Sequence, residues 1–207
     1  MDLSGRIAGV VSTTTFDDLS EETVLASKMA ILDTIGVMIA GSGAGEGVGD
    51  VIGLLDDLGG AERCSVVGFG KKSNPVLAAM ANGALAHSID YDDAHDDAFV
   101  HPSASVVPAA LTAGEFANAS GRDLIRAVSL GNDVMCRLGF AVSNPEENGG
   151  LLWMLPVLLG TFSATVAASA ILGLTKGQVE NALGIAYGRA GGSKELVIEP
   201  GALRGLY

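Results

Sequence analysis

The sequence predicts an all-α fold, a multi-helix bundle-like domain, on the strength of three observations. Apolar residues recur at helical spacing in several segments. Capping residues, often with an acidic residue or a proline just after them, precede these segments as helix-start signals. Of the 207 residues, 48% are hydrophobic and 17% charged, a composition too apolar for general disorder. We therefore expect a single helical domain over residues 1–207.

The first long helix is predicted to follow Ser20, a capping residue with acidic residues after it. Apolar residues through Ile39 lie on nearly all sides of this helix, which predicts that it is buried and that it ends at Gly41. The glycine-rich residues 41–49 follow a helix and match no phosphate-binding register, so we expect a flexible connector. The next expected elements are a helix over 51–58, an extended segment over 63–68, and a helix from Asn74 and Pro75 to about Ile89.

The second half is expected to be helical with short breaks. The segment 151–174 carries no charged residue and is long enough to span a bilayer. It contains Pro156 and many small residues, so we expect the central helix of a core and no membrane partner. The other expected elements are helices over 105–117 (opened by Pro102 and Ser103), 124–140 (after Ser120) and 179–187 (after Thr175), a polar loop over 143–150 and an irregular end over 191–207.

Charge and cysteine usage narrow the function further. The net charge of −12 argues against a nucleic-acid partner and against anionic membrane surfaces. Cys64 and Cys136 are far apart in the sequence and form neither a disulfide framework nor a metal motif, so we expect two buried thiols. The first eleven residues include Asp2 and lack an apolar run, so we expect no signal peptide and a cytoplasmic location.

All three histidines lie between residues 87 and 101, together with five acidic residues. This concentration is compatible with three interpretations. The segment could be a solvated acidic loop. His95-Asp96 could belong to a divalent-metal site of the HD hydrolase type. It could instead perform metal-free acid/base catalysis, with His101 transferring the proton and Asp90 as its carboxylate partner.

Several motifs decide between these interpretations through a resemblance. They are KMAILDTIG (28–36), NGALAHSIDYDD (82–93), HPS (101–103) with a later PAA and Glu115, and GT…AAS…LGL (160–174). In order and spacing they resemble the MmgE/PrpD family, which includes 2-methylcitrate dehydratase and cis-aconitate decarboxylase.

The resemblance implies a helical domain, a homodimer, and cofactor-free, metal-free chemistry on a small carboxylate. The reaction would be a dehydration or decarboxylation by proton transfer at carbon. The alternatives are an epimerase of the same family or a repurposed scaffold that pairs with another chain. The implied catalytic residues are His101 and Asp90. The implied substrate-binding residues are Asp93, His87, Ser103 and Arg204.

The sequence departs from the family pattern at three positions. Ala94 and Met154 stand where decarboxylase-like members have a threonine and a histidine, and Arg204 stands in place of a lysine. We therefore expect a less polar pocket. Family members are longer and carry a second α/β lid domain, so we expect a fragment or a natural half. Apolar surface left exposed would then serve self-association or a second subunit that supplies the lid.

Overall fold

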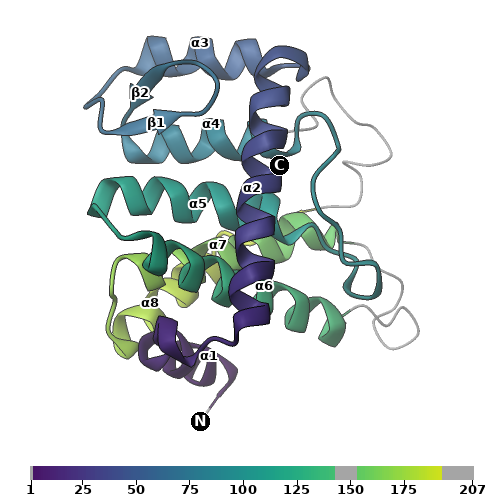
Figure 1. Cartoon of the computed structure of the whole chain (residues 1–207), viewed down its shortest axis with the longest axis vertical. Coiled ribbons are helices and arrows are strands. Elements are labelled where there is room, and N and C mark those ends of the chain that lie inside the picture. Colours follow the sequence, from purple (N-terminus) through teal and green to yellow (C-terminus); the bar gives the residue numbers. More distant parts are fainter. Residues whose placement is uncertain (1, 143–152, 193–207) are drawn as a thin grey trace.

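The computed structural model describes residues 2–142 and 153–192, and over these residues the fold is all-α, as predicted (Figure 1). One small hairpin accompanies the helices: β1 (Cys64–Val66) pairs antiparallel with β2 (Lys71–Ser73). The helices are α1 (Leu3–Thr13), α2 (Glu21–Ala44), α3 (Val48–Leu58), α4 (Pro75–His87), α5 (Pro102–Ala117), α6 (Gly121–Val142), α7 (Leu155–Ile171) and α8 (Lys176–Tyr187).

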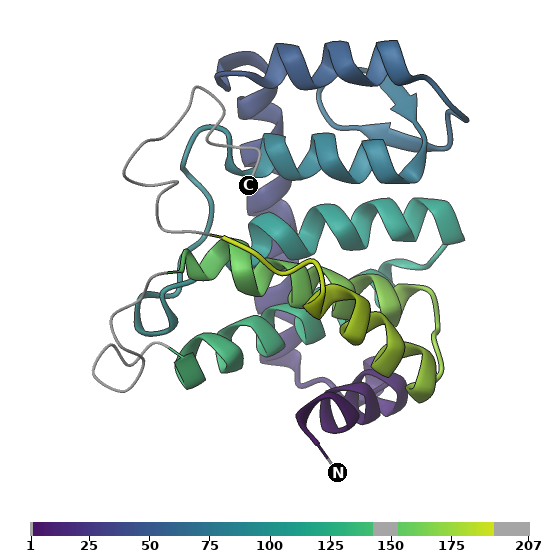
Figure 2. The ribbon, with the colours of Figure 1, turned by 180° about the vertical axis from the view of Figure 1, so that it is seen from behind.

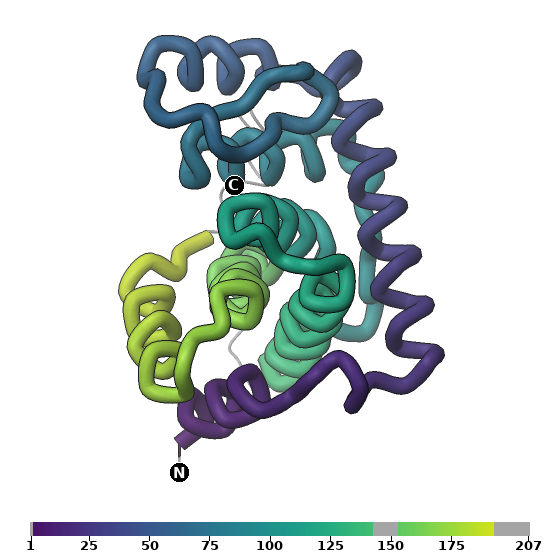
Figure 3. The backbone as a smooth tube through the Cα atoms, turned by 60° about the vertical axis from the view of Figure 1, so that its left-hand side comes forward, coloured from purple at the N-terminus to yellow at the C-terminus, as the bar shows by residue number. Residues whose placement is uncertain are grey.

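Most helices are stacked on one another, and α2 runs across the stack. Figure 1 shows α3, α4 and α5 one below another, with α6, α7, α8 and α1 beneath them. From behind, α7 and α8 lie on the face opposite α2 (Figure 2). In Figure 3, α2 forms one outer edge along nearly the whole molecule. Helices α4 and α5 are antiparallel neighbours, so the end of α4 and the start of α5 lie at the same side of the stack.

The centre of the core is where α5, α6 and α7 pack together. Glycines permit this close approach. A Cβ on Gly131 of α6 would lie 2.7 Å from Val106 of α5, and one on Gly160 of α7 would lie 2.5 Å from Ser105 Oγ. No described residue of α7 is exposed. The prediction of a central, closely packed helix within 151–174 is therefore confirmed for residues 155–171.

The predicted helix starts after Ser20, Asn74 and Thr175 are confirmed by their capping hydrogen bonds. Ser20 Oγ accepts from the Thr23 amide, and Asn74 Oδ1 accepts from two amides of the first turn of α4. Thr175 and Gln178 form a reciprocal capping box at α8. These side chains satisfy amides that have no partner inside the helix. The helices expected over 51–58, 105–117 and 124–140 each begin three residues earlier than predicted, at Val48, Pro102 and Gly121.

The predicted end of α2 at Gly41 is wrong, because the helix continues to Ala44. The glycine at 41 instead serves a close approach to α4. A Cβ there would lie 2.5 Å from Ser88 Oγ and 2.7 Å from the Leu85 carbonyl oxygen. The expected connector over 41–49 shrinks to the three residues between α2 and α3.

The prediction that α2 is buried is also wrong. It packs against α4, α5 and α6 on one side only, and its other side exposes Leu25, Met29, Leu32 and Ile39. Among the described residues, α2 is the one helix long and apolar enough to cross a membrane, a test that core helices of many proteins also pass. That test is therefore weak support for a span.

Two elements were not predicted, and some expectations lie outside the described residues. The sequence patterns predicted neither helix α1 nor strand β2. Both cysteines are free, Cys64 buried and Cys136 partly so. The polar loop over 143–150, most of the irregular end and Arg204 fall outside the residues that the structure describes.

Candidate active site

The histidine-rich stretch forms the end of α4, a loop over residues 88–101 and the start of α5. Because α4 and α5 are antiparallel, His87 at the end of one helix and His101 at the start of the other come close together. Their ring centroids lie 5.8 Å apart. Asp90 and Phe99 both adopt left-handed backbone conformations, with φ of 54° and 51°. Such conformations are rare outside glycine and often mark functional loops.

Asp92 lies between the two histidines, and we call these three residues the Asp92 cluster. Its Oδ1 lies 2.9 Å from His87 Nδ1, a hydrogen bond, and its Oδ2 lies 3.3 Å from His101 Nδ1. The second contact has ion-pair distance but is not aligned as a hydrogen bond. The Asp92 side chain is only 1% exposed. An ionised carboxylate accepts hydrogen bonds and donates none, so His87 Nδ1 carries the hydrogen in its bond to Asp92.

The electrostatics of the cluster favour an ionised acid and a protonatable base. Burial is the largest influence on the pKa of Asp92 and raises it. The contacts with His101 and His87 outweigh burial, so the net pKa lies well below its usual range. The Asp92 carboxylate in turn raises the pKa of His101, against the opposing effect of burial. The Asp92 carboxylate therefore favours the protonated form of His101.

Asp93 and Ser103 hold the loop onto the start of α5. The Asp93 carboxylate accepts from the Ser103 amide at 3.0 Å and from Ser103 Oγ at 2.6 Å. Asn132 of α6 donates to the same Oγ at 3.1 Å. His101 is the N-cap of α5, but its side chain makes no capping hydrogen bond. Asp93, in the loop, accepts from an amide of the first turn instead. Burial raises the pKa of Asp93, and the bonds from Ser103 oppose the rise.

The predicted partner of His101, Asp90, lies at the exposed turn just before Asp92. It acts on His101 electrostatically and contributes to the rise of its pKa. The carboxylate at 3.3 Å from His101 is that of Asp92. His87, Asp90 and Asp92 also offer ligand atoms within 4.8 Å of one another, a set that could hold a metal ion. A metal at His87 Nδ1 would have to displace the hydrogen bond to Asp92.

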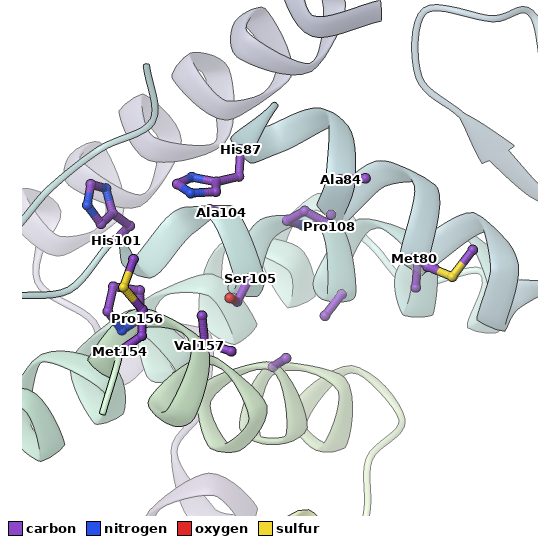
Figure 4. A pocket seen from close by; sticks show the side chains of 14 residues that line it. Met80, Ala84, His87, His101, Ala104, Ser105, Pro108, Met154, Pro156 and Val157 are labelled. Carbon is purple, nitrogen blue, oxygen red and sulfur yellow. The ribbon is translucent and has the colours of Figure 1, made fainter. Parts of the chain in front are cut away.

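A cavity of about 280 Å³ opens beside the histidines, between α4, α5 and α7 (Figure 4). We call it the histidine cavity. His87 and His101 lie at one end, with Met154 and Pro156 next to His101. A second hollow of about 700 Å³ shares His101 and Met154 but is bordered by Asp96 and Asp97. His101 therefore faces both spaces.

The structure brings five of the six predicted site residues to one place, and the sixth, Arg204, lies outside the described part. His87 and His101 line the histidine cavity. Ser103 is fully buried and, with Asp93, positions the loop. Their predicted substrate contacts stay predictions.

Sequence reasoning missed Asp92 as the centre of the site. Its position five residues after a histidine that ends a helix was the available signal. It also missed Asn132, which lies in another helix and has no local motif.

The described residues thus form a helical domain in which a buried carboxylate and two partly exposed histidines lie beside a cavity. The chain belongs to the MmgE/PrpD family, because the model of the MmgE/PrpD N-terminal domain matches residues 5–199. This finding confirms the resemblance inferred from the motifs.

The similar curated proteins are cis-aconitate decarboxylases. The one from Aspergillus terreus is 35% identical over 136 residues, covering 62% of this chain and 27% of that protein. The one from Mus musculus is 30% identical over 191 residues, covering 89% of this chain and 38% of that protein. The one from Homo sapiens is 30% identical over 180 residues. The chain thus spans about a third of the length of these relatives, and it belongs to a family of lyase-type enzymes.

Proposed function

We propose that this chain carries the proton-transfer site of a lyase that removes water or carbon dioxide from a small carboxylate without a cofactor. The observation that carries the proposal is the Asp92 cluster at the end of the histidine cavity. A buried, ionised Asp92 lies 3.3 Å from His101 and stabilises its cation. This is the arrangement that general acid/base catalysis requires.

The two candidate reactions use His101 in different ways. In a dehydration, neutral His101 takes a proton from the carbon next to a carboxylate. The C–O bond on the neighbouring carbon then breaks, and the departing hydroxide takes that proton from the His101 imidazolium and leaves as water. In a decarboxylation, the C–C bond to a carboxylate breaks, carbon dioxide leaves, and protonated His101 gives its proton to the remaining carbon. Either way a negative charge develops on the substrate, and a nearby imidazolium stabilises it.

The other residues have supporting parts in this proposal. His87 shares Asp92 and lines the same cavity, so it contributes a second imidazole to a substrate carboxylate. Asp90 handles protons at the exposed edge of the loop or adjusts the charge at His101. Ala94 borders the second hollow and Met154 borders both spaces, which supports a substrate less polar than the tricarboxylates.

The test is turnover of unsaturated and hydroxylated di- and tricarboxylates by the natural chain, followed by proton NMR in deuterated water. We expect turnover, with deuterium incorporated at carbon of the product in a decarboxylation or exchanged into the remaining substrate in a reversible dehydration. We expect a loss of about 10²- to 10⁴-fold in His101→Ala. His95→Ala is the matched control, because the His95 ring packs on Phe140 and borders the second hollow but not the histidine cavity. Equal turnover in His101→Ala would overturn the assigned role. Wild-type protein without turnover or deuterium exchange would favour the repurposed scaffold.

A further inference from the structure

The histidine cavity has one polar end and one apolar end, and two helices build it in the same way. On α4, His87 is followed towards the start of the helix by Ala84 and Met80. On α5, His101 is followed by Ala104 and Pro108, with all of these residues lining the cavity. Steps of three and four residues place each set on one helix face.

The antiparallel helices align these two sets. Each histidine lies seven residues from the apolar residue at the far end, about 10 Å at 1.5 Å per residue. Figure 4 shows the two histidines at one end, Met80 at the other, and Ala84 and Pro108 between them. The cavity is therefore an elongated groove with its reactive groups at one end.

The third wall, from α7, continues the apolar surface. It consists of Pro156, Val157 and Ala164, with Met154 just before the helix. Apart from the histidines and Ser105, the described side chains that line the groove are apolar or are glycine, and none of them is charged. A substrate that consisted only of carboxylate-bearing carbons would leave most of this surface without a matching group.

The neighbouring hollow does not offer the same environment. Asp96 and Asp97 border it, and their negative charge disfavours a carboxylate substrate there. Among the described residues around His101, the imidazoles thus contact the charged end of a substrate, and the apolar groove holds the rest of it.

We propose that the substrate carries an unbranched alkyl chain, which lies along the groove from the histidines towards Met80. The inference rests on the proposed function only for its reacting end, because the groove binds the chain whether or not chemistry follows. With C–C bonds of about 1.5 Å, a groove of about 10 Å holds roughly seven bonds. Each buried methylene tightens binding by about fourfold.

The test is calorimetric binding of butanedioates that carry a 2-alkyl chain from methyl to decyl, using the natural chain. We expect the Kd to fall about fourfold per methylene and to level off near seven carbons. A Kd that does not depend on chain length would overturn the proposal.

Gly83→Leu locates the binding. Gly83 lines the groove, and a Cβ there would meet nothing within 4 Å, so the leucine side chain fills the groove without a backbone clash. We expect the variant to bind the methyl compound as before and to lose the gain for longer chains. Gly53→Leu on α3 is the matched control, since it also points into open space. Unchanged chain-length dependence in Gly83→Leu would contradict the proposal.

Met80→Asp provides a second variant, because Met80 is partly exposed and tolerates a polar residue. It should weaken only the longer chains. Chain-length-dependent binding without turnover would refute the lyase function and leave this inference standing. Turnover of short carboxylates without any preference for longer chains would refute this inference and leave the lyase function standing.

Discussion

At the scale of single residues, Asp92 is the group on which the site depends. It is buried, and it contacts one nitrogen of each histidine. In Asp92→Asn the amide carries no charge, so we expect the pKa of His101 to fall towards its ordinary value and turnover to drop on the order of 10²-fold or more. NMR titration of the histidines measures the first effect without a substrate. Asp97→Asn, an exposed change in the same loop, is the control.

The same contact predicts how stability depends on pH. The pKa of His101 is raised in the folded state, so its contribution is present in full below the unfolded pKa of about 6.5. It is lost as the pH rises through the raised folded value. Urea unfolding between pH 6 and pH 9, as a rough window, should show this loss in wild type and a flatter profile in Asp92→Asn. Parallel profiles would contradict the pairing.

Asp93 makes a structural prediction of its own. Asp93→Ala removes two hydrogen bonds from the start of α5 and leaves the buried Ser103 with fewer partners. We expect a loss of about 1–3 kcal/mol in the free energy of unfolding. Asp96→Ala, in an exposed part of the loop, should cost less than about 0.5 kcal/mol. Equal losses in the two variants, measured by urea unfolding, would show that the loop is not held by Asp93.

At the scale of elements, the glycines of the helices differ in what an added side chain would meet. Gly41 lies where α2 meets α4, and an added Cβ would come within 2.7 Å of the Leu85 carbonyl oxygen. Gly41→Ala should therefore cost about 1–3 kcal/mol. Gly53→Ala, in α3 with nothing within 4 Å of an added Cβ, should gain up to about 1 kcal/mol. Chemical unfolding of both variants checks the difference, and effects of the same sign would contradict it.

Features that depend on contacts between residues adjacent in sequence were predictable, and features that depend on distant contacts were not. Helix starts at Ser20, Asn74 and Thr175 were predictable, because a cap and its helix are adjacent in sequence. The meeting of His87 with His101 was not, because it depends on α4 and α5 packing antiparallel. Burial of α2 was predicted wrongly, since apolar residues on all sides of a helix do not reveal how many neighbours it has.

The sequence did not show which carboxylate lies at the centre of the site. Asp90 and Asp92 both lie in the recognised motif, and their spacing alone does not separate their roles. The left-handed turn at Asp90 leaves that residue exposed and carries Asp92 between the histidines. Backbone conformation, which the sequence does not specify residue by residue, decided which carboxylate pairs with His101.

At the scale of the whole molecule, the exposed side of α2 is the feature that calls for a partner. Leu25, Met29, Leu32 and Ile39 are all more than half exposed, and Leu32 is 74% exposed. Together with the exposed Gly36 and Gly43 they follow steps of four and three residues, the spacing of a helix-packing seam. We propose that this seam pairs with the seam of a second copy of the chain.

The seam is complementary to itself. In an antiparallel pair related by a two-fold axis near Thr34, Leu25 lies opposite Gly43 of the second copy and Leu32 lies opposite Gly36. Each leucine then meets a glycine, where an added Cβ finds open space in the single chain, and Met29 meets Ile39. A two-fold interface requires this kind of self-matching patch. A different subunit would have no reason to match the same order of large and small residues.

The prediction is that the protein is a dimer and that Leu32→Lys converts it to a monomer, because two lysines would face the seam without a counter-charge. Val76→Lys, an equally exposed apolar position on α4, should leave the dimer intact. Sedimentation analysis measures the mass of each variant. A wild-type monomer, or a dimer that survives Leu32→Lys, would contradict the prediction.

The opposite side of α2 contacts Ser88 and Leu85 at the end of α4. Pairing through α2 would thus also brace the helix that carries His87, so we expect Leu32→Lys to weaken the hydrogen-exchange protection of the 88–101 loop.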